Sequence, residues 1–104
     1  FADADFKLGN IYSYPNPATG GISPIIHIEV GIADRIEIKI FNIAAELVDS
    51  AEIGGADWKI IRNKYCYEYT LNASNLASGV YIYLVRAMKG SETIKELKKL
   101  AIIK

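Results

Sequence analysis

The sequence has little of what catalytic and membrane proteins need: its 104 residues include one cysteine, one histidine and no long apolar run. Cys66 alone cannot form an internal disulfide, so an apolar core must stabilise the fold. A membrane-spanning helix needs about 18 or more apolar residues in succession. No stretch of this chain approaches that length, so we predict no membrane span. His27 has no second histidine with which to build a zinc site, and no serine lies in a G-x-S-x-G turn. We therefore expect no metal, no cofactor and no catalytic residue.

The chain also has no excess of positive or negative charge, because its formal net charge is zero. The two halves differ, however. Residues 1–52 contain three basic and eight acidic residues, a balance of −5, whereas residues 53–104 contain nine and four, a balance of +5. We expect strands from both halves to interleave, so that these charges neutralise one another. Glu92 and Glu96 interrupt the basic half, and we expect no nucleic-acid partner.

What the chain does contain is alternation of apolar and polar residues with the period of β-strands. The clearest case is 35–41, where three isoleucines alternate with Glu37 and Lys39 and so separate a buried face from an exposed one. Residues 58–62 are open to two interpretations, an edge strand or a loop over the core. About seven short strands separated by turn residues predict an all-β sandwich or barrel. The predicted strands are 11–14, 25–30, 35–41, 46–53, 65–71, 80–88 and 93–103.

Residues 1–10 show no such period, and the chain does not begin with methionine. We interpret 1–10 as a linker from a preceding domain and 11–104 as the folded domain. The chain is therefore expected to be part of a longer polypeptide.

Two features other than the strands could carry function. His27 shares a strand face with Ile25 and Glu29, and Cys66 alternates with tyrosines. A structural histidine and a buried, unreactive thiol are the favoured interpretations. The side chains of Tyr65, Tyr67 and Tyr69 share one face of a strand, where they either stack on sugar rings in a carbohydrate-binding module or pack within the fold.

Several short motifs occur together in a characteristic order. These are Tyr14-Pro15-Asn16-Pro17, then Ile38 to Asn42, then Leu76 to Tyr83, and finally Lys98 to Lys104. Over residues 11–104 this order resembles the C-terminal immunoglobulin-like modules of exported bacterial proteins. That group includes the type IX secretion C-terminal sorting domains and the immunoglobulin-like domain of the flagellar hook-capping protein. The resemblance makes the fold an immunoglobulin-like antiparallel β-sandwich of about seven strands.

The resemblance also implies a function, a non-catalytic sorting or anchoring module of a larger exported bacterial protein, secreted or held at the cell surface. Its partners would be the secretion machinery or neighbouring domains of the same chain, with self-association through an edge strand as a further possibility. A structural or adhesive immunoglobulin-like spacer is the alternative. The recognition residues that the resemblance implies are Gly79, Val80, Tyr81, Lys98, Lys99 and Lys104. The chain departs from the family at Ala44-Ala45, where relatives usually have glycine, so we expect a turn that avoids positive φ.

Overall fold

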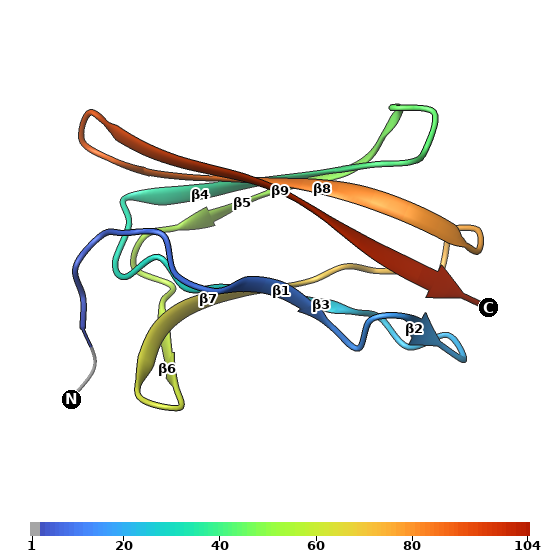
Figure 1. Ribbon diagram of the computed structural model, residues 1–104, viewed down its shortest axis with the longest axis horizontal. Coiled ribbons are helices and arrows are strands. Elements are labelled where there is room, and N and C mark those ends of the chain that lie inside the picture. Colours follow the sequence, from blue (N-terminus) through green and yellow to red (C-terminus); the bar gives the residue numbers. More distant parts are fainter. Residues whose placement is uncertain (1–2) are drawn as a thin grey trace.

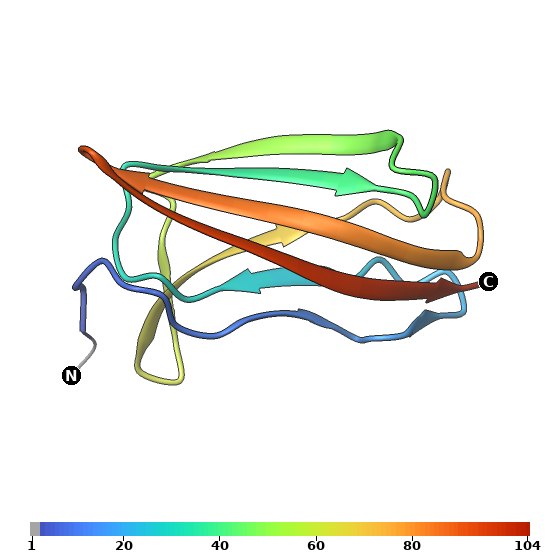
Figure 2. The same cartoon turned by 45° about the horizontal axis from the view of Figure 1, so that its top comes forward.

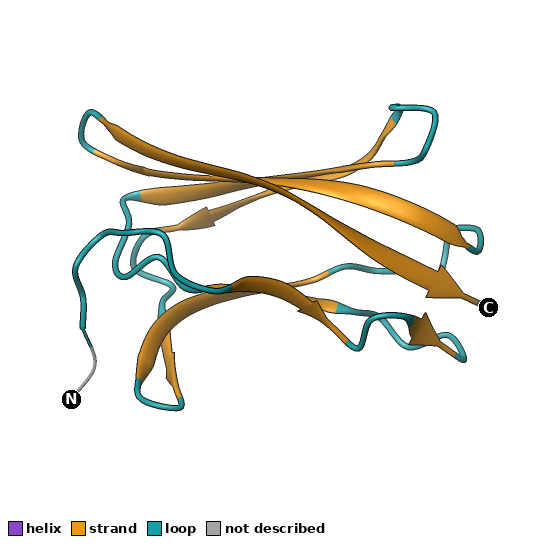
Figure 3. Cartoon of the chain, in the orientation of Figure 1, coloured by secondary structure: helices purple, strands orange, loops and turns teal. Residues whose placement is uncertain are grey.

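A computed structural model describes residues 3–104, which form nine strands in two stacked sheets and contain no helix (Figures 1 and 3). Accordingly, no helix long and apolar enough to cross a membrane occurs in this part of the chain. The strands are β1 (Ile11–Tyr14), β2 (Ala18–Thr19), β3 (Ile25–Ile28), β4 (Arg35–Phe41), β5 (Leu47–Gly54), β6 (Lys59–Ile61), β7 (Lys64–Thr70), β8 (Gly79–Lys89) and β9 (Glu92–Ile103).

The order of the strands identifies the sandwich as immunoglobulin-like. One sheet has the order β1-β3-β7-β6 and the other has the order β2-β9-β8-β4-β5. These are the two layers of an immunoglobulin sandwich, in which the first, second, fifth and fourth main strands form one sheet. The predicted fold class is therefore confirmed. All neighbouring strands within the described residues pair antiparallel except β2 and β9, which are parallel.

The predicted number of strands was too low, because two strands are too short to show a period of two in the sequence. β2 has only two residues and lies in the proline-rich turn. Residues 58–62, which were left open, include the three-residue edge strand β6. The other seven strands lie where the alternation of apolar and polar residues places them.

The core forms between the sheets from the alternating isoleucines. Ile36, Ile38 and Ile40 of β4 are completely buried, and they face Ile26 and Ile28 of the opposite sheet. The two halves of the chain interleave as expected, since β4 from the acidic half pairs with β8 from the basic half. An ion pair of 2.9 Å between Arg86 Nη1 and Glu37 Oε1 joins them.

The Tyr14-Pro15-Asn16-Pro17 turn carries the chain from one sheet to the other. β1 belongs to the smaller sheet and β2 to the larger one, and both X-Pro bonds of the turn are cis. The Asn16 side chain donates to the carbonyl of Lys99 at 3.4 Å and accepts from the backbone N–H of Ala101 at 3.0 Å. The amide thus takes the place of a strand along the edge of β9, since an amide side chain offers one donor group and one acceptor.

The turn between β4 and β5 contradicts the expectation that it avoids positive φ. Ala45 adopts a φ of 64°, in the left-handed region. The Asn42 carboxamide oxygen accepts from the backbone N–H groups of Ala44 and Glu46, both at 3.0 Å, and this holds the turn. The hydrogen bonds of Asn42 thus hold Ala45 in a conformation that glycine adopts more readily than alanine.

Replacing Ala45 by glycine should therefore stabilise the protein. A left-handed conformation costs a non-glycine residue roughly 1–2 kcal/mol, part of which is offset by the greater freedom of glycine in the unfolded chain. We expect the free energy of unfolding in urea to rise by about 0.5–1 kcal/mol. Ala44→Gly is the matched control, because Ala44 has no positive φ and should gain nothing. Equal shifts for the two variants would contradict this account of the turn.

The assignment of 1–10 as a linker remains a prediction. Residues 3–10 form no strand, but they run alongside the segment that follows β3. Their backbone hydrogen bonds join Lys7 to Val30, Gly9 to Glu29 and Ala4 to Ile32.

Candidate functional site

The six residues expected to take part in recognition lie in one region, which we call the β8–β9 corner (Gly79, Val80, Tyr81, Lys98, Lys99 and Lys104). The start of β8 pairs with the end of β9, so that Val80 lies opposite Ala101 and Lys99 lies opposite Ile82. Figures 1 and 2 both show the start of β8 and the end of β9 together at one end of the sandwich. Folding therefore brings together residues that are up to 25 positions apart in the sequence.

Within the β8–β9 corner the residues differ in exposure. Lys98, Lys99 and Lys104 are exposed, and Val80 is 45% exposed. Gly79 is also exposed, and a Cβ added to it would meet no atom within 4 Å. These residues are available to a partner.

Tyr81 differs from the rest of the corner because it is buried. Its side chain is 6% exposed, and its hydroxyl donates to the backbone carbonyl of Ala77 at 2.7 Å. This is the tyrosine corner of immunoglobulin-like domains, in which a tyrosine near the start of the sixth main strand bonds to backbone a few residues upstream. Tyr81 fixes the direction in which the chain enters β8.

The end of the chain is tied to the segment before β8. The backbone N–H of Lys104 donates to Ser78 Oγ at 2.8 Å, and Lys104 Nζ donates to the carbonyl of Ser74 at 2.9 Å. Together with the bonds from Asn16, these contacts hold the last residues of β9 in one position.

The row of Tyr65, Tyr67 and Tyr69 faces the interior of the sandwich. Tyr67 is completely buried, and its hydroxyl accepts from the N–H of Ala33 at 3.1 Å and donates to the carbonyl of Gly55 at 2.7 Å. The prediction of a face that stacks on sugars is therefore wrong at Tyr67. Tyr69 donates to Asp49 Oδ2 at 2.6 Å, across to β5 of the other sheet. The hydroxyls of Tyr67 and Tyr69 thus join the smaller sheet to the loops and strand around it, and the ring of Tyr65 packs edge-on against Trp58 with ring centroids 4.9 Å apart.

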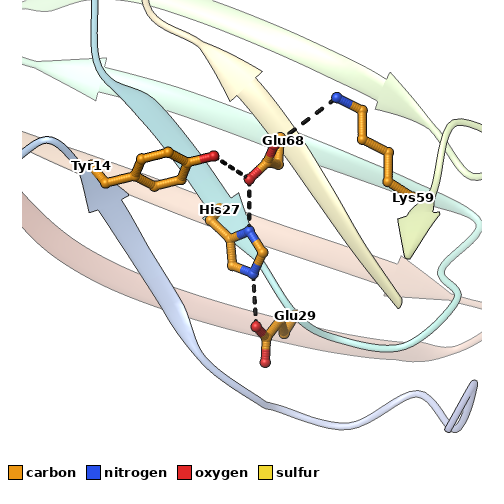
Figure 4. Close-up of polar contacts among 5 residues, drawn as sticks. All are labelled: Tyr14, His27, Glu29, Lys59 and Glu68. Atoms are coloured by element: carbon orange, nitrogen blue, oxygen red, sulfur yellow. Dashed lines mark hydrogen bonds and ion pairs between the residues drawn. The ribbon is translucent and has the colours of Figure 1, made fainter. Parts of the chain in front are cut away.

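His27 lies on the outer face of the smaller sheet, where two carboxylates hold it (Figure 4). Its side chain is 2% exposed, with Nδ1 at 2.8 Å from Glu68 Oε2 and Nε2 at 2.7 Å from Glu29 Oε2. Each ring nitrogen of His27 thus contacts one carboxylate oxygen, so both of its polar atoms have a partner. Tyr14 also donates to Glu68 Oε2 at 2.7 Å, and Lys59 Nζ lies 4.0 Å from Glu68 Oε1. We call these five residues the histidine cluster.

The histidine cluster is a structural network in which the polar groups bond to one another. Burial alone would raise the pKa of Glu68, but the hydrogen bonds from His27 and Tyr14 outweigh burial and the pKa is lowered. Among residues 3–104, no group of three or more histidine, cysteine or acidic side chains is arranged to hold a metal ion. Cys66, which lies on β7 as Glu68 does, is completely buried. Burial raises the pKa of its thiol, so less of the reactive thiolate is present. Cys66 is buried, as expected, and His27 lies in a hydrogen-bonded network; a purely structural role for both remains a prediction.

Two tyrosines should titrate unusually late in the folded protein. The hydrogen bond to Glu68 raises the pKa of Tyr14 to about 12, and burial and the bond to Asp49 raise that of Tyr69 to about 12. A raised folded-state pKa gives stability that is complete below the ordinary value near 10 and is lost as the pH rises toward 12. We expect the urea midpoint to fall over this window. We also expect ultraviolet titration at equilibrium to show fewer tyrosinates at pH 11 in folded than in unfolded protein. Tyr14→Phe should reduce both effects, and an unchanged titration would contradict the role of Glu68.

Sequence reasoning missed Asn16 and Glu68 as organising residues. For Asn16 the available signal was an amide between two prolines, a residue in a fixed turn with its side chain free to bond elsewhere. For Glu68 the signal was an acidic residue in an otherwise aromatic strand, but nothing in the sequence indicated that His27 lies opposite it.

A scan against protein families matches residues 12–102 to the family described as secretion system C-terminal sorting domain. The search of curated proteins found no match, and the search of solved structures found none either.

Proposed function

The chain belongs to the secretion system C-terminal sorting domains, and from this premise we propose that the secretion machinery recognises it through the β8–β9 corner. Domains of this family act as sorting signals of exported proteins, which are secreted or attached to the cell surface. The family is non-enzymatic in general. We also propose that this chain has no catalytic role and that its parent protein carries any enzymatic activity elsewhere.

The proposal rests on one observation. Exposed lysines of β9 and an unobstructed glycine of β8 lie near the same end of these two paired strands. Gly79 and Val80 of β8 lie opposite Ile102 and Ala101 at the end of β9. Lys99 and Lys98 come just before that end, opposite Ile82 and Tyr83. A glycine with open space above it lets the backbone of a partner approach closely. Tyr81 is buried, so its part in recognition is to position β8 and not to touch the partner.

The edge of β9 adds a second means of contact. β9 pairs with β8 along its length, but β2 covers only Ile102 and Ile103 on the other side. Asn16 bonds the carbonyl of Lys99 and the N–H of Ala101, so these odd-numbered residues direct backbone groups outward. By alternation Leu97, Lys95 and Thr93 do the same, and no strand within residues 3–104 pairs with them there. An extended segment of the partner would add to this edge.

A charge-reversal pair tests the recognition by lysine. The full chain is fused to an exported reporter in a bacterium with type IX secretion, and surface delivery is measured. Lys98→Glu/Lys99→Glu should lower delivery about tenfold, the effect of losing roughly 1.4 kcal/mol of binding. Lys64→Glu/Lys89→Glu changes the charge equally at exposed positions away from the β8–β9 corner and the edge of β9, and should leave delivery near the wild-type level.

A side chain added at Gly79 tests the close approach without disturbing the fold. Because the position is open and φ is not positive, Gly79→Leu should leave the urea midpoint unchanged but lower delivery. Normal delivery of both the Gly79→Leu and the Lys98→Glu/Lys99→Glu fusions would remove the proposal. That outcome would favour the alternative that the domain is a structural or adhesive spacer.

A further inference from the structure

The outer face of the larger sheet carries apolar side chains that the fold does not use. We call this surface the apolar sheet face. Ile43 is 82% exposed, Leu97 is 62% exposed and Leu47 is 54% exposed, which is unlike the paired polar residues on the other outer face. Exposed apolar side chains that gather on one face mark interaction sites, whereas scattered ones do not. The apolar sheet face consists of Phe41, Ile43, Leu47, Val80, Ile82, Leu84, Leu97 and Ile103.

Strand register places these residues side by side. Phe41 of β4 lies between Leu47 of β5 and Ile82 of β8, and in the next outward-facing row Leu84 lies opposite Leu97 of β9. The turn after β4 adds a hollow of about 260 Å³ beside Ile43, with Ala45 in its wall. Figure 2 shows that this turn and the β8–β9 corner lie at the same end of the molecule. The apolar sheet face therefore continues from the proposed recognition corner.

Two lysines border this region, while the carboxylates in the next row of the same face, Glu37 and Glu52, lie 2.9 Å from Arg86 and 4.0 Å from Arg35. Lys39 lies beside Leu84, and Lys99 lies opposite Ile82. No aspartate or glutamate occurs in residues 39–43, 80–84 or 97–103, which supply most of the apolar sheet face. Glu46, in the adjoining turn, already accepts from the side chain of Asn42 at 3.0 Å. The apolar sheet face thus has a border of cations.

We propose that the apolar sheet face docks a protein of the secretion machinery whose contact surface is apolar and bordered by carboxylates. The inference rests on the proposed function, because a sorting domain requires such a partner. Charge complementarity selects the partner, since its carboxylates would meet Lys39 and Lys99 at the rim. The apolar residues supply the affinity, and the hollow beside Ile43 accepts one protruding side chain.

A second copy of the chain fits this face less well. A symmetric dimer joins the same patch of both copies. It would bring two sets of lysines together, while the carboxylates of Glu37 and Glu52 on the same face already face Arg86 and Arg35. Like charges in juxtaposition oppose association. The chain's own charge pattern therefore argues for a different protein.

The test uses residues outside the β8–β9 corner, so that the two proposals are separated. Ile43→Ser/Leu47→Ser removes two exposed side chains of the apolar sheet face, and Ile22→Ser/Ile60→Ser removes two of comparable exposure, 54% and 52%, away from it. Each pair is introduced into the full-chain reporter fusion, and its urea midpoint is measured to establish folding. We expect the first pair to lower surface delivery about tenfold and the second to change it less than about twofold. Lys39→Glu should lower delivery as well.

The outcomes assign the occupant. Normal delivery of the Ile43→Ser/Leu47→Ser fusion overturns the docking face, and the β8–β9 corner stands if Lys98→Glu/Lys99→Glu alone fails. Loss in the first pair with normal delivery of the lysine pair supports docking through the apolar side chains, and it removes both the β8–β9 corner and the contact at Lys99. Two results with the purified chain would also overturn the proposal. One is a dimer in sedimentation velocity that the Ile43→Ser/Leu47→Ser pair abolishes. The other is binding to phosphatidylglycerol vesicles that the same pair abolishes.

Discussion

Replacing Tyr67 by alanine should cost about 4 kcal/mol of folding free energy, enough to unfold much of the protein at room temperature. The ring is completely buried between the sheets, so its removal leaves a cavity that the rigid sandwich cannot close. Its hydroxyl also holds the β3–β4 loop at Ala33 and the end of β5 at Gly55. Tyr67 therefore joins three parts of the fold.

Tyr67→Phe separates the hydroxyl from the ring. The variant keeps the packing but leaves the N–H of Ala33 and the carbonyl of Gly55 without this partner, and we expect a loss of about 1–2 kcal/mol in urea denaturation. Tyr12→Phe, at a ring that is 41% exposed, is the control and should change the value by less than about 0.5 kcal/mol. Equal losses in the two phenylalanine variants would show that the Tyr67 hydroxyl does not organise the loops.

Removing the Glu68 carboxylate should have the second largest effect. Glu68→Ala leaves one ring nitrogen of His27 and the hydroxyl of Tyr14 without their partner, in a place where the Glu68 side chain is only 10% exposed. Leaving two buried polar groups without a partner costs about 3 kcal/mol. The loss should appear in urea denaturation at pH 7, where the lowered pKa keeps Glu68 ionised.

The sign of the pH dependence provides a check on this prediction. A lowered folded-state pKa gives stability that is present above the unfolded value near 4.5 and is lost as the pH falls through the folded value. The difference between wild type and Glu68→Ala should therefore shrink at pH values below about 4. Glu52→Ala, at a side chain that is 59% exposed, should cost less than about 0.5 kcal/mol at either pH. A pH-independent difference would contradict the stabilisation of the ionised Glu68 by its hydrogen bonds.

How much of this structure the sequence reveals depends on the range of the interactions. The isoleucines of β4 predict their strand because a period of two is a local property, and β8 is predicted by its run of β-branched and aromatic residues, which is local as well. β2 and β6 are shorter than that signal requires, and their pairing depends on partners distant in the chain. The φ of Ala45 was missed because the hydrogen bonds of Asn42, and not the residue type, decide it.

The sites divide in the same way. The β8–β9 corner could be expected from motif order, and the hairpin of β8 and β9 then brings its residues together by local pairing. The sequence could not predict that the tyrosine row faces the interior. Alternation shows that the three tyrosines share one face of the strand, but it does not show whether the other sheet covers that face. The apolar sheet face could not be predicted either. Both faces of β8 carry apolar residues, so the sequence does not show which face is buried and which is exposed.

Surface delivery of a reporter fused to the intact chain tests the central claim most directly. In a host with type IX secretion the fusion should reach the cell surface or the medium, while in the same host without a working translocon it should remain inside. Retention of the fusion in the competent host, with the domain folded, would contradict the assignment of this sandwich as a sorting signal.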